Sequence, residues 1–216
     1  DPNLSFSETY LRVQTTESIP FLYYYLVKIC NKIFGYDPIV GRCFSAFFGF
    51  LSIFTIGILC KKITRNKSYL FAACLMSLNI FLIVNSQEMR VYIFTFFLIS
   101  LSLIFFFNLL KEDKTNIFTI NFLLFTIFTF LSILSHPFAA ILLASIIIFL
   151  TIDYIFFLKK HFKVNISLIL ILFPIIGFLY HYFSYVSLGN IGWLEQPSLK
   201  FFTDFYFSKF FGSRLL

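Results

Sequence analysis

Charged residues are scarce in this sequence: Asp, Glu, Lys and Arg make up 12% of its 216 residues. It also contains only 2 Met, 1 Trp and 8 Gly, whereas hydrophobic residues account for 59% and Phe alone for 35 residues. A soluble domain of this size cannot hide so much apolar surface, because part of every globule faces water. The shortage of charge therefore excludes a soluble domain and predicts an all-α, multi-pass transmembrane helical bundle.

Acidic residues are fewer than basic ones, with 10 Asp and Glu against 17 Lys and Arg. An excess of positive charge indicates nucleic-acid binding in some soluble domains. Here most basic residues fall in short gaps between apolar runs, so we interpret them as topology signals and expect no nucleic-acid partner. The four Cys residues have no CxxC or Cys/His spacing, which favours small core residues over metal ligands or disulfides.

Six apolar runs approach the roughly 20 residues that a membrane-spanning helix needs. We expect these spans near residues 38–60, 68–84, 91–110, 116–134, 137–158 and 166–183. The gaps at 61–67, 111–115 and 159–163 contain four, two and three Lys or Arg residues. The gaps on the opposite side contain one, Arg90. The positive-inside rule therefore places the three basic gaps in the cytoplasm.

The predicted spans divide the chain into three parts. Residues 1–34 form an extracytoplasmic segment whose second half, rich in Tyr and Lys, is an interfacial amphipathic helix. Residues 35–183 form the six-span transmembrane domain. Residues 184–216 form an extracytoplasmic or interfacial segment leading to a missing C-terminal part, since we expect the chain to be a piece of a longer protein.

Two helix boundaries are marked by single residues. Gly35 predicts the end of the interfacial helix, because glycine stops a helix. Asp37 followed by Pro38 is a start signal for the next helix.

The polar stretch Asn85-Ser86-Gln87-Glu88-Met89-Arg90 separates two long apolar runs. If the third span begins near Asn85, its unpaired N–H groups and the Arg90 guanidinium form an anion site at the outer surface. A structural interpretation stays open, in which Asn85 and Glu88 form a capping box and Arg90 anchors the span at the headgroups. Similar alternatives stay open for His136, as an interfacial polar residue or a ligand, and for Glu17, as a first-turn acid or a base.

Several of these segments together resemble one protein family. The matching residues are Ile19-Pro20-Phe21-Leu22-Tyr23-Tyr24, Phe34-Gly35, Val40-Gly41-Arg42-Cys43-Phe44-Ser45-Ala46, Ser86-Gln87-Glu88-Met89-Arg90-Val91-Tyr92 and Ser135-His136-Pro137-Phe138. They resemble the polyprenyl-phosphate-dependent membrane glycosyltransferases of family 39, which have the GT-C fold and include the dolichyl-phosphate-mannose protein mannosyltransferases. The order and spacing agree over roughly residues 17–160.

The resemblance implies an enzyme that moves a sugar from a polyprenyl-phosphate carrier to a hydroxyl of a lipid, glycan or protein on the extracytoplasmic face. Its partners would be that sugar donor, the acceptor and the lipid bilayer. Its location would be the inner (plasma) membrane, and low charge with abundant Phe, Ile, Lys and Asn indicates a bacterial source. The substrate-binding residues that it suggests are Gln87, Glu88, Arg90, Tyr92 and His136.

The catalytic base is the least defined part of the predicted site. The family uses an acidic residue in the first outer loop, which we expect just upstream of Asp1. Within the chain, Glu8 and Glu17 are the candidate acids. Ile19 stands where the family often has His or Lys, so any phosphate or metal contact from that position is lost. No metal ligand is predicted and no cofactor is certain, although a divalent metal ion stays an open alternative.

Two other classes of function remain as alternatives. A transporter or flippase for lipid-linked glycans should have broken helices, internal repeats and polar residues at the middle of the bilayer. A non-catalytic assembly subunit would use its charged residues only as membrane anchors. The polar residues of this chain gather instead between spans, and this pattern favours a surface site.

Overall fold

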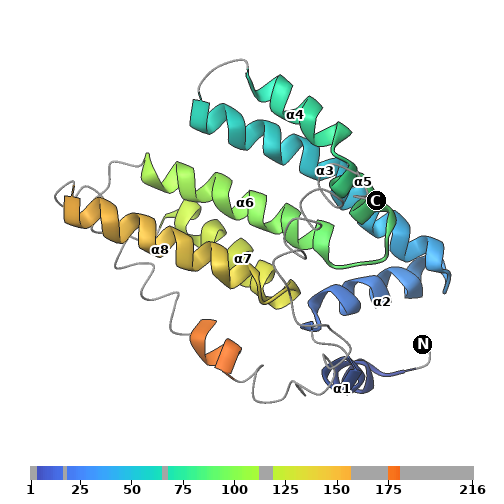
Figure 1. The fold of residues 1–216 in the computed structure, drawn as a ribbon. Helices are drawn as coiled ribbons and strands as arrows, with labels where there is room; N and C mark the ends of the chain where they lie inside the picture. The colour runs from blue at the N-terminus through green and yellow to red at the C-terminus, as the bar shows by residue number, and fades with distance from the viewer. Residues whose placement is uncertain (1–3, 17–18, 65–67, 112–118, 157–174, 181–216) are drawn as a thin grey trace, which may run out of the picture.

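The computed structural model describes residues 4–16, 19–64, 68–111, 119–156 and 175–180, and these residues contain α-helices but no strand. The all-helical class predicted from the sequence is confirmed. The helices named in Figure 1 are α1 (Phe6–Thr16), α2 (Leu22–Phe34), α3 (Pro38–Thr64), α4 (Ser68–Leu78), α5 (Ile80–Gln87), α6 (Tyr92–Leu110), α7 (Ile120–Ser135) and α8 (Ala139–Phe156).

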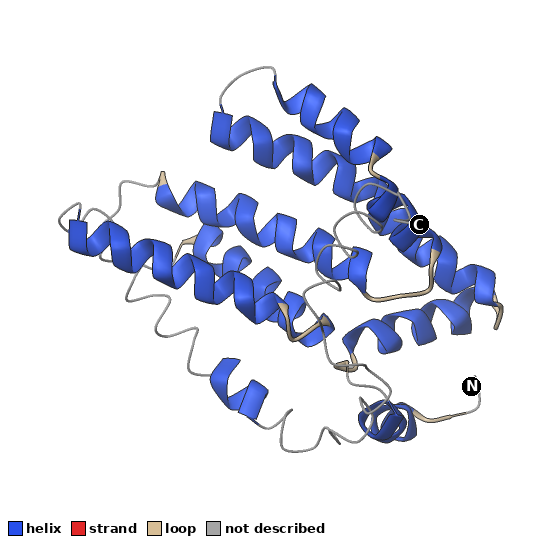
Figure 2. Cartoon of the chain, viewed as in Figure 1, coloured by secondary structure: helices blue, strands red, loops and turns tan. Residues whose placement is uncertain are grey.

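The long helices pack side by side with α6 in the middle. It contacts α3 on one flank and α7 on the other, while α4 and α5 cover α3, and α8 packs on α7 (Figure 1). Helix α2 lies across one end of the bundle, against α3 and α7, and α1 packs on α2. Figure 2 shows the loop that leads from α5 back to α6 beside α2.

Two helices of the described chain, α3 and α6, are long and apolar enough to cross a membrane by themselves. Helices α4 and α5 pass the same test only as a pair, with a bend of 56° between them. The helix over the span expected at 68–84 is therefore broken, and the Asn79 side chain, which accepts a hydrogen bond from Leu82 N at 3.1 Å, caps the helix that follows the break. Helices α7 and α8 are apolar but shorter, and the count of six spans stays a prediction.

Polar side chains join the helices inside this apolar bundle. The Ser102 hydroxyl of α6 and the Thr129 hydroxyl of α7 form a buried hydrogen bond of 2.6 Å. Small hydroxyl residues also line the facing surfaces at Ser45, Ser52 and Ser132, all with no exposed surface. Such residues let apolar helices approach closely, because lipid tails give little hydrophobic drive for helix association.

Candidate functional site

The turn between α2 and α3 brings the start of α3 to the end of the bundle that α2 crosses. Gly35 ends α2 with φ of 96°, a conformation that favours glycine. The Asp37 carboxylate then accepts a hydrogen bond from Ile39 N at 2.8 Å and caps α3. The helix stop and start predicted from Gly35 and Asp37-Pro38 therefore occur as expected.

The segment 88–91 crosses the same end and connects α5 to α6. Helix α5 ends at Gln87, Glu88 is its extended C-cap residue, and α6 begins only at Tyr92. The third span therefore does not begin near Asn85, and the alternative of a capping box with Glu88 is wrong as well, because Asn85 lies within α5, where its amide donates to the Phe81 carbonyl at 2.7 Å. Arg90 precedes α6 instead of lying in its first turn, and its N–H donates to the Glu88 carbonyl at 2.8 Å.

Two glycines of α3 allow this segment to pack closely. A Cβ atom at Gly41 would overlap the Met89 sulfur, and one at Gly49 would lie 2.6 Å from Ser86 Cβ. Real Cβ atoms do not approach other atoms so closely, so a side chain at either position would force a neighbour to move. The Met89 sulfur is near the end of a flexible side chain and could shift, whereas Ser86 Cβ is attached to the backbone of α5. Gly49 therefore sets how closely α5 packs on α3.

Tyr23 of α2 fills the space beneath the segment. Its side chain is 2% exposed, and its hydroxyl forms a 3.2 Å hydrogen bond with Ser45 of α3. Burial raises the pKa of Tyr23, while the Ser45 hydrogen bond and the positive charge of Arg90 act in the opposite direction. Arg90 itself is exposed, so its charge lies at the surface above a buried tyrosine.

His136 reaches the same end from the loop between α7 and α8. Its ring centroid lies 5.7 Å from that of Tyr92 and 5.0 Å from that of Phe138. The His136 Nδ1 atom accepts a hydrogen bond from Phe138 N at 3.3 Å, which shapes the turn into α8. Burial lowers the pKa of His136 and favours the neutral imidazole.

The structure thus brings some of the predicted substrate-binding residues together and leaves others apart. Tyr92 and His136 are in ring contact, and the charge of Arg90 acts on Tyr23. Gln87 and Glu88 are exposed on the same segment, with no contact to His136 among those recorded for the described residues. Sequence reasoning had not selected Tyr23 or Ser45 individually, although both belong to the stretches that carry the family resemblance.

The structure describes only one of the two candidate catalytic acids. Glu8 starts α1 in a reciprocal cap, since its carboxylate accepts from Ser5 N at 2.6 Å and its N–H donates to the Ser5 hydroxyl at 3.1 Å. Hydrogen bonding of the Glu8 carboxylate to the Ser5 side chain and to the Ser5 backbone lowers the pKa of Glu8, which makes its carboxylate a weaker base. Glu17 lies outside the described residues. Within the part of the chain that the structure describes, no three His, Cys, Asp or Glu residues are grouped to hold a metal ion.

Apolar helices and a polar site at one end of their bundle define an integral membrane protein. A family model described as dolichyl-phosphate-mannose-protein mannosyltransferase matches residues 18–181, which is well over half of the chain. The chain therefore belongs to this family of membrane glycosyltransferases with the GT-C fold, as its sequence resemblance indicated. No curated protein and no solved structure matches it in the corresponding comparisons.

Proposed function

We propose that this protein transfers a sugar from a polyprenyl-phosphate carrier to a hydroxyl acceptor on the extracytoplasmic face of a bacterial inner membrane. The family match over residues 18–181 carries the proposal. The geometry supports it, because Arg90 and Tyr92 lie at the start of α6 and the His136 ring, from the loop between α7 and α8, contacts the Tyr92 ring.

Arg90 has the chemistry that the leaving phosphate requires. Negative charge grows on the carrier phosphate as the glycosidic bond breaks, and a guanidinium can donate two parallel hydrogen bonds to it. The first N–H groups of α6, which follow directly at Tyr92, add the positive end of a helix dipole. In this proposal Tyr92 and the neutral His136 ring form one wall of the donor site, with Gln87 and Glu88 at its edge.

The general base lies elsewhere in this scheme. Sugar transfer needs an acid–base residue near the acceptor hydroxyl, but the Glu8 carboxylate already caps α1. We therefore assign the base to an acid other than Glu8, and Glu17, which lies outside the described residues, is the remaining candidate. No divalent metal ion is required for the role given to Arg90.

One observation favours the transporter alternative. The α4–α5 pair is bent by 56° at Asn79, and broken helices are typical of carriers that bind their substrate within the bilayer. The Asn79 side chain, however, is committed to the cap of α5. Sugar transfer without net movement of the carrier across vesicles would distinguish the enzyme from a transporter.

The direct test replaces Arg90 in the longest available form of the protein, reconstituted with a radiolabelled polyprenyl-phosphate sugar. Arg90→Ala should lower the rate of transfer by about 100-fold or more, the effect of losing one positioned donor to a developing negative charge. Arg90→Lys should recover only part of it, because an ammonium lacks the bidentate fork. Lys61→Gln, which removes an exposed cation at the opposite end of α3, should leave the rate unchanged. Equal rates for Arg90→Ala and the wild type would refute the proposed site.

A further inference from the structure

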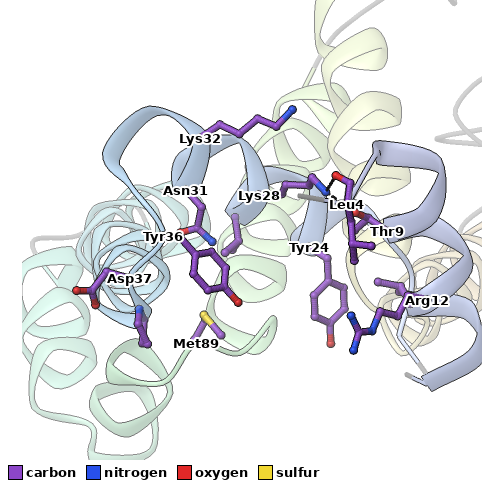
Figure 3. Close-up of a pocket in the computed structure, with 13 residues that line it drawn as sticks. Leu4, Thr9, Arg12, Tyr24, Lys28, Asn31, Lys32, Tyr36, Asp37 and Met89 are labelled. Atoms are coloured by element: carbon purple, nitrogen blue, oxygen red, sulfur yellow. Dashed lines mark hydrogen bonds between the residues drawn. The ribbon is translucent and has the colours of Figure 1, made fainter. Parts of the chain in front are cut away.

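A cavity of about 680 Å³ lies between α1 and α2, beside the segment that carries Arg90. Figure 3 shows its lining, which comes from α1, α2, the turn at Tyr36–Pro38 and the Met89 side chain. Its volume is in the range of small-molecule binding sites. Because Met89 is shared with the 88–91 segment, an occupant of this cavity would lie next to the proposed donor site.

The cavity contains a buried hydrogen-bond acceptor without a partner. Asn31, in the last turn of α2, lines the cavity, and its Oδ1 atom is buried with no hydrogen bond from the described residues. Leaving such a group unpaired destabilises the folded protein unless a ligand supplies the missing donor. The unpaired Asn31 oxygen therefore indicates a ligand that can donate a hydrogen bond from an O–H or N–H group.

The other lining groups narrow the class of ligand. Tyr24 and Tyr36 offer aromatic rings, which can stack on the apolar face of a sugar ring (Figure 3). Three basic residues, Arg12, Lys28 and Lys32, line the cavity against one acid, Asp37. This excess of positive charge favours an occupant with a negative charge.

Lys28 builds the wall between α1 and α2. Its side chain is 7% exposed, and its ammonium donates to the Leu4 carbonyl at 2.5 Å and to the Thr9 hydroxyl at 2.6 Å. A third hydrogen bond goes to the Ser5 carbonyl at 3.3 Å. With its donors used in this way, Lys28 fixes α1 on α2 and gives the cavity its shape. Lys32 is more exposed, and its ammonium lies 4.7 Å from the Phe6 ring centroid.

We propose that the cavity between α1 and α2 binds the acceptor of the transfer reaction, and that this acceptor is a carbohydrate, an acidic sugar being preferred over a neutral one. This inference rests on the proposed function only in calling the bound sugar an acceptor. The binding of a sugar in the cavity does not depend on it. It assigns Asn31 as the residue that accepts a hydrogen bond from a sugar hydroxyl. It also selects glycans from the lipid, glycan and protein acceptors that the family resemblance allows.

Binding can be measured without turnover, by calorimetric titration of the purified, detergent-solubilised protein with D-glucuronate and with D-glucose. Wild-type protein should bind glucuronate more tightly than glucose. Asn31→Leu should weaken the binding of both sugars by about tenfold, the value of one lost hydrogen bond to a buried acceptor. Lys32→Gln should reduce the preference for glucuronate by about threefold, in line with a partly exposed charge.

A matched control separates a binding role from a structural one. Thr95 of α6 also has a buried oxygen without a hydrogen-bond partner among the described residues, but it does not line the cavity. Thr95→Val and Asn31→Leu each remove an unpaired polar atom, so neither should lower the thermal unfolding midpoint. Only Asn31→Leu should lose sugar binding. Asn31→Ala provides the same comparison if Asn31→Leu does not fold.

The outcomes distinguish this inference from the proposed function. Sugar binding that depends on Asn31, in a protein without transfer activity, would support the binding site and refute the enzyme. Sugar transfer to a protein or lipid acceptor, with unchanged kinetics in Asn31→Leu and no binding of either sugar at millimolar concentration, would overturn the inference and leave the enzyme in place. Equal binding to wild type and Asn31→Leu would also overturn it.

Discussion

The two ends of α3 pack against their neighbours in different ways. Near its start, Gly41 and Gly49 admit the Met89 and Ser86 side chains into space that a Cβ atom would occupy. Near its end, a Cβ atom at Gly57 would meet its nearest neighbours at 3.5 and 3.6 Å, which is ordinary van der Waals contact. Close approach is therefore confined to the half of α3 that faces the 88–91 segment.

The polar side chains at the two ends of the bundle also differ, in whether they have hydrogen-bond partners. At the far end, Lys62 donates to Asn108 at 2.5 Å, Asn108 donates to Asn121 at 3.2 Å, and Lys111 donates to the Lys62 carbonyl at 2.9 Å. This polar chain ties α3, α6 and α7 together with its members paired. At the 88–91 end, the side-chain oxygens of Asn31 and Thr95 are buried without a hydrogen-bond partner among the described residues, and of the two only Asn31 lines the cavity. The far end is thus held together by paired polar groups, whereas the 88–91 end keeps one acceptor, Asn31, beside a cavity.

The largest effect should come from adding one methyl group at each end of α3. Gly49→Ala places its Cβ atom against Ser86 Cβ and must move α5 away, which should lower the free energy of unfolding by about 1–3 kcal/mol. Gly57→Ala meets no such obstacle and should raise it by about 0.5–1 kcal/mol, because alanine is the better helix former. Unfolding in detergent would measure both. Equal effects at the two positions would remove the packing difference on which the comparison rests.

A smaller effect should follow from breaking the polar chain at the far end. Asn108→Leu removes the hydrogen bonds that Asn108 makes with the Lys62 ammonium and the Asn121 oxygen and should lower the free energy of unfolding by about 1 kcal/mol, a typical value for hydrogen bonds between membrane helices. Sugar transfer, corrected for the amount of folded protein, should not change.

The control for this variant is Ser145→Ala on α8. Its hydroxyl donates only within its own helix, to the Ile141 carbonyl at 2.8 Å, among the bonds that the structure records. Its loss should leave the unfolding midpoint close to that of the wild type. A fall in sugar transfer in Asn108→Leu with an unchanged midpoint would show that the far end takes part in function, contrary to the comparison.

Local signals were sufficient to predict part of this architecture. The all-helical class follows from apolar runs, and the boundary at Gly35 and Asp37 follows from residues that act on their own backbone. The family resemblance followed from short stretches in register and is confirmed by the match over residues 18–181. Each of these depends on residues close together in the sequence.

Long-range contacts and competing caps could not be predicted in the same way. Asn79 and Asn85 are both cap-forming residues, and the sequence does not show that Asn79 caps α5 while Asn85 bonds back to Phe81. The contacts of Tyr23 with Ser45 and of Tyr92 with His136 arise from helix packing. The site residues named from sequence therefore stay predictions, with Tyr23 now added beneath Arg90.

The smallest expected effect is on the pH dependence of stability, which should respond to a change at one end of the bundle and not at the other. Burial lowers the pKa of His136 below its ordinary value of about 6.5, so the unfolded chain takes up a proton before the folded protein does. Stability should therefore fall as pH drops below about 6.5, until the pKa of the folded state is reached. His136→Phe keeps an aromatic ring beside Tyr92 and removes the titration, so the dependence of the unfolding midpoint on pH should flatten in that window. Lys61→Gln at the far end should keep the wild-type dependence. A slope that persists in His136→Phe would place the titrating group elsewhere and weaken the assignment of the proton-sensitive site to the 88–91 end.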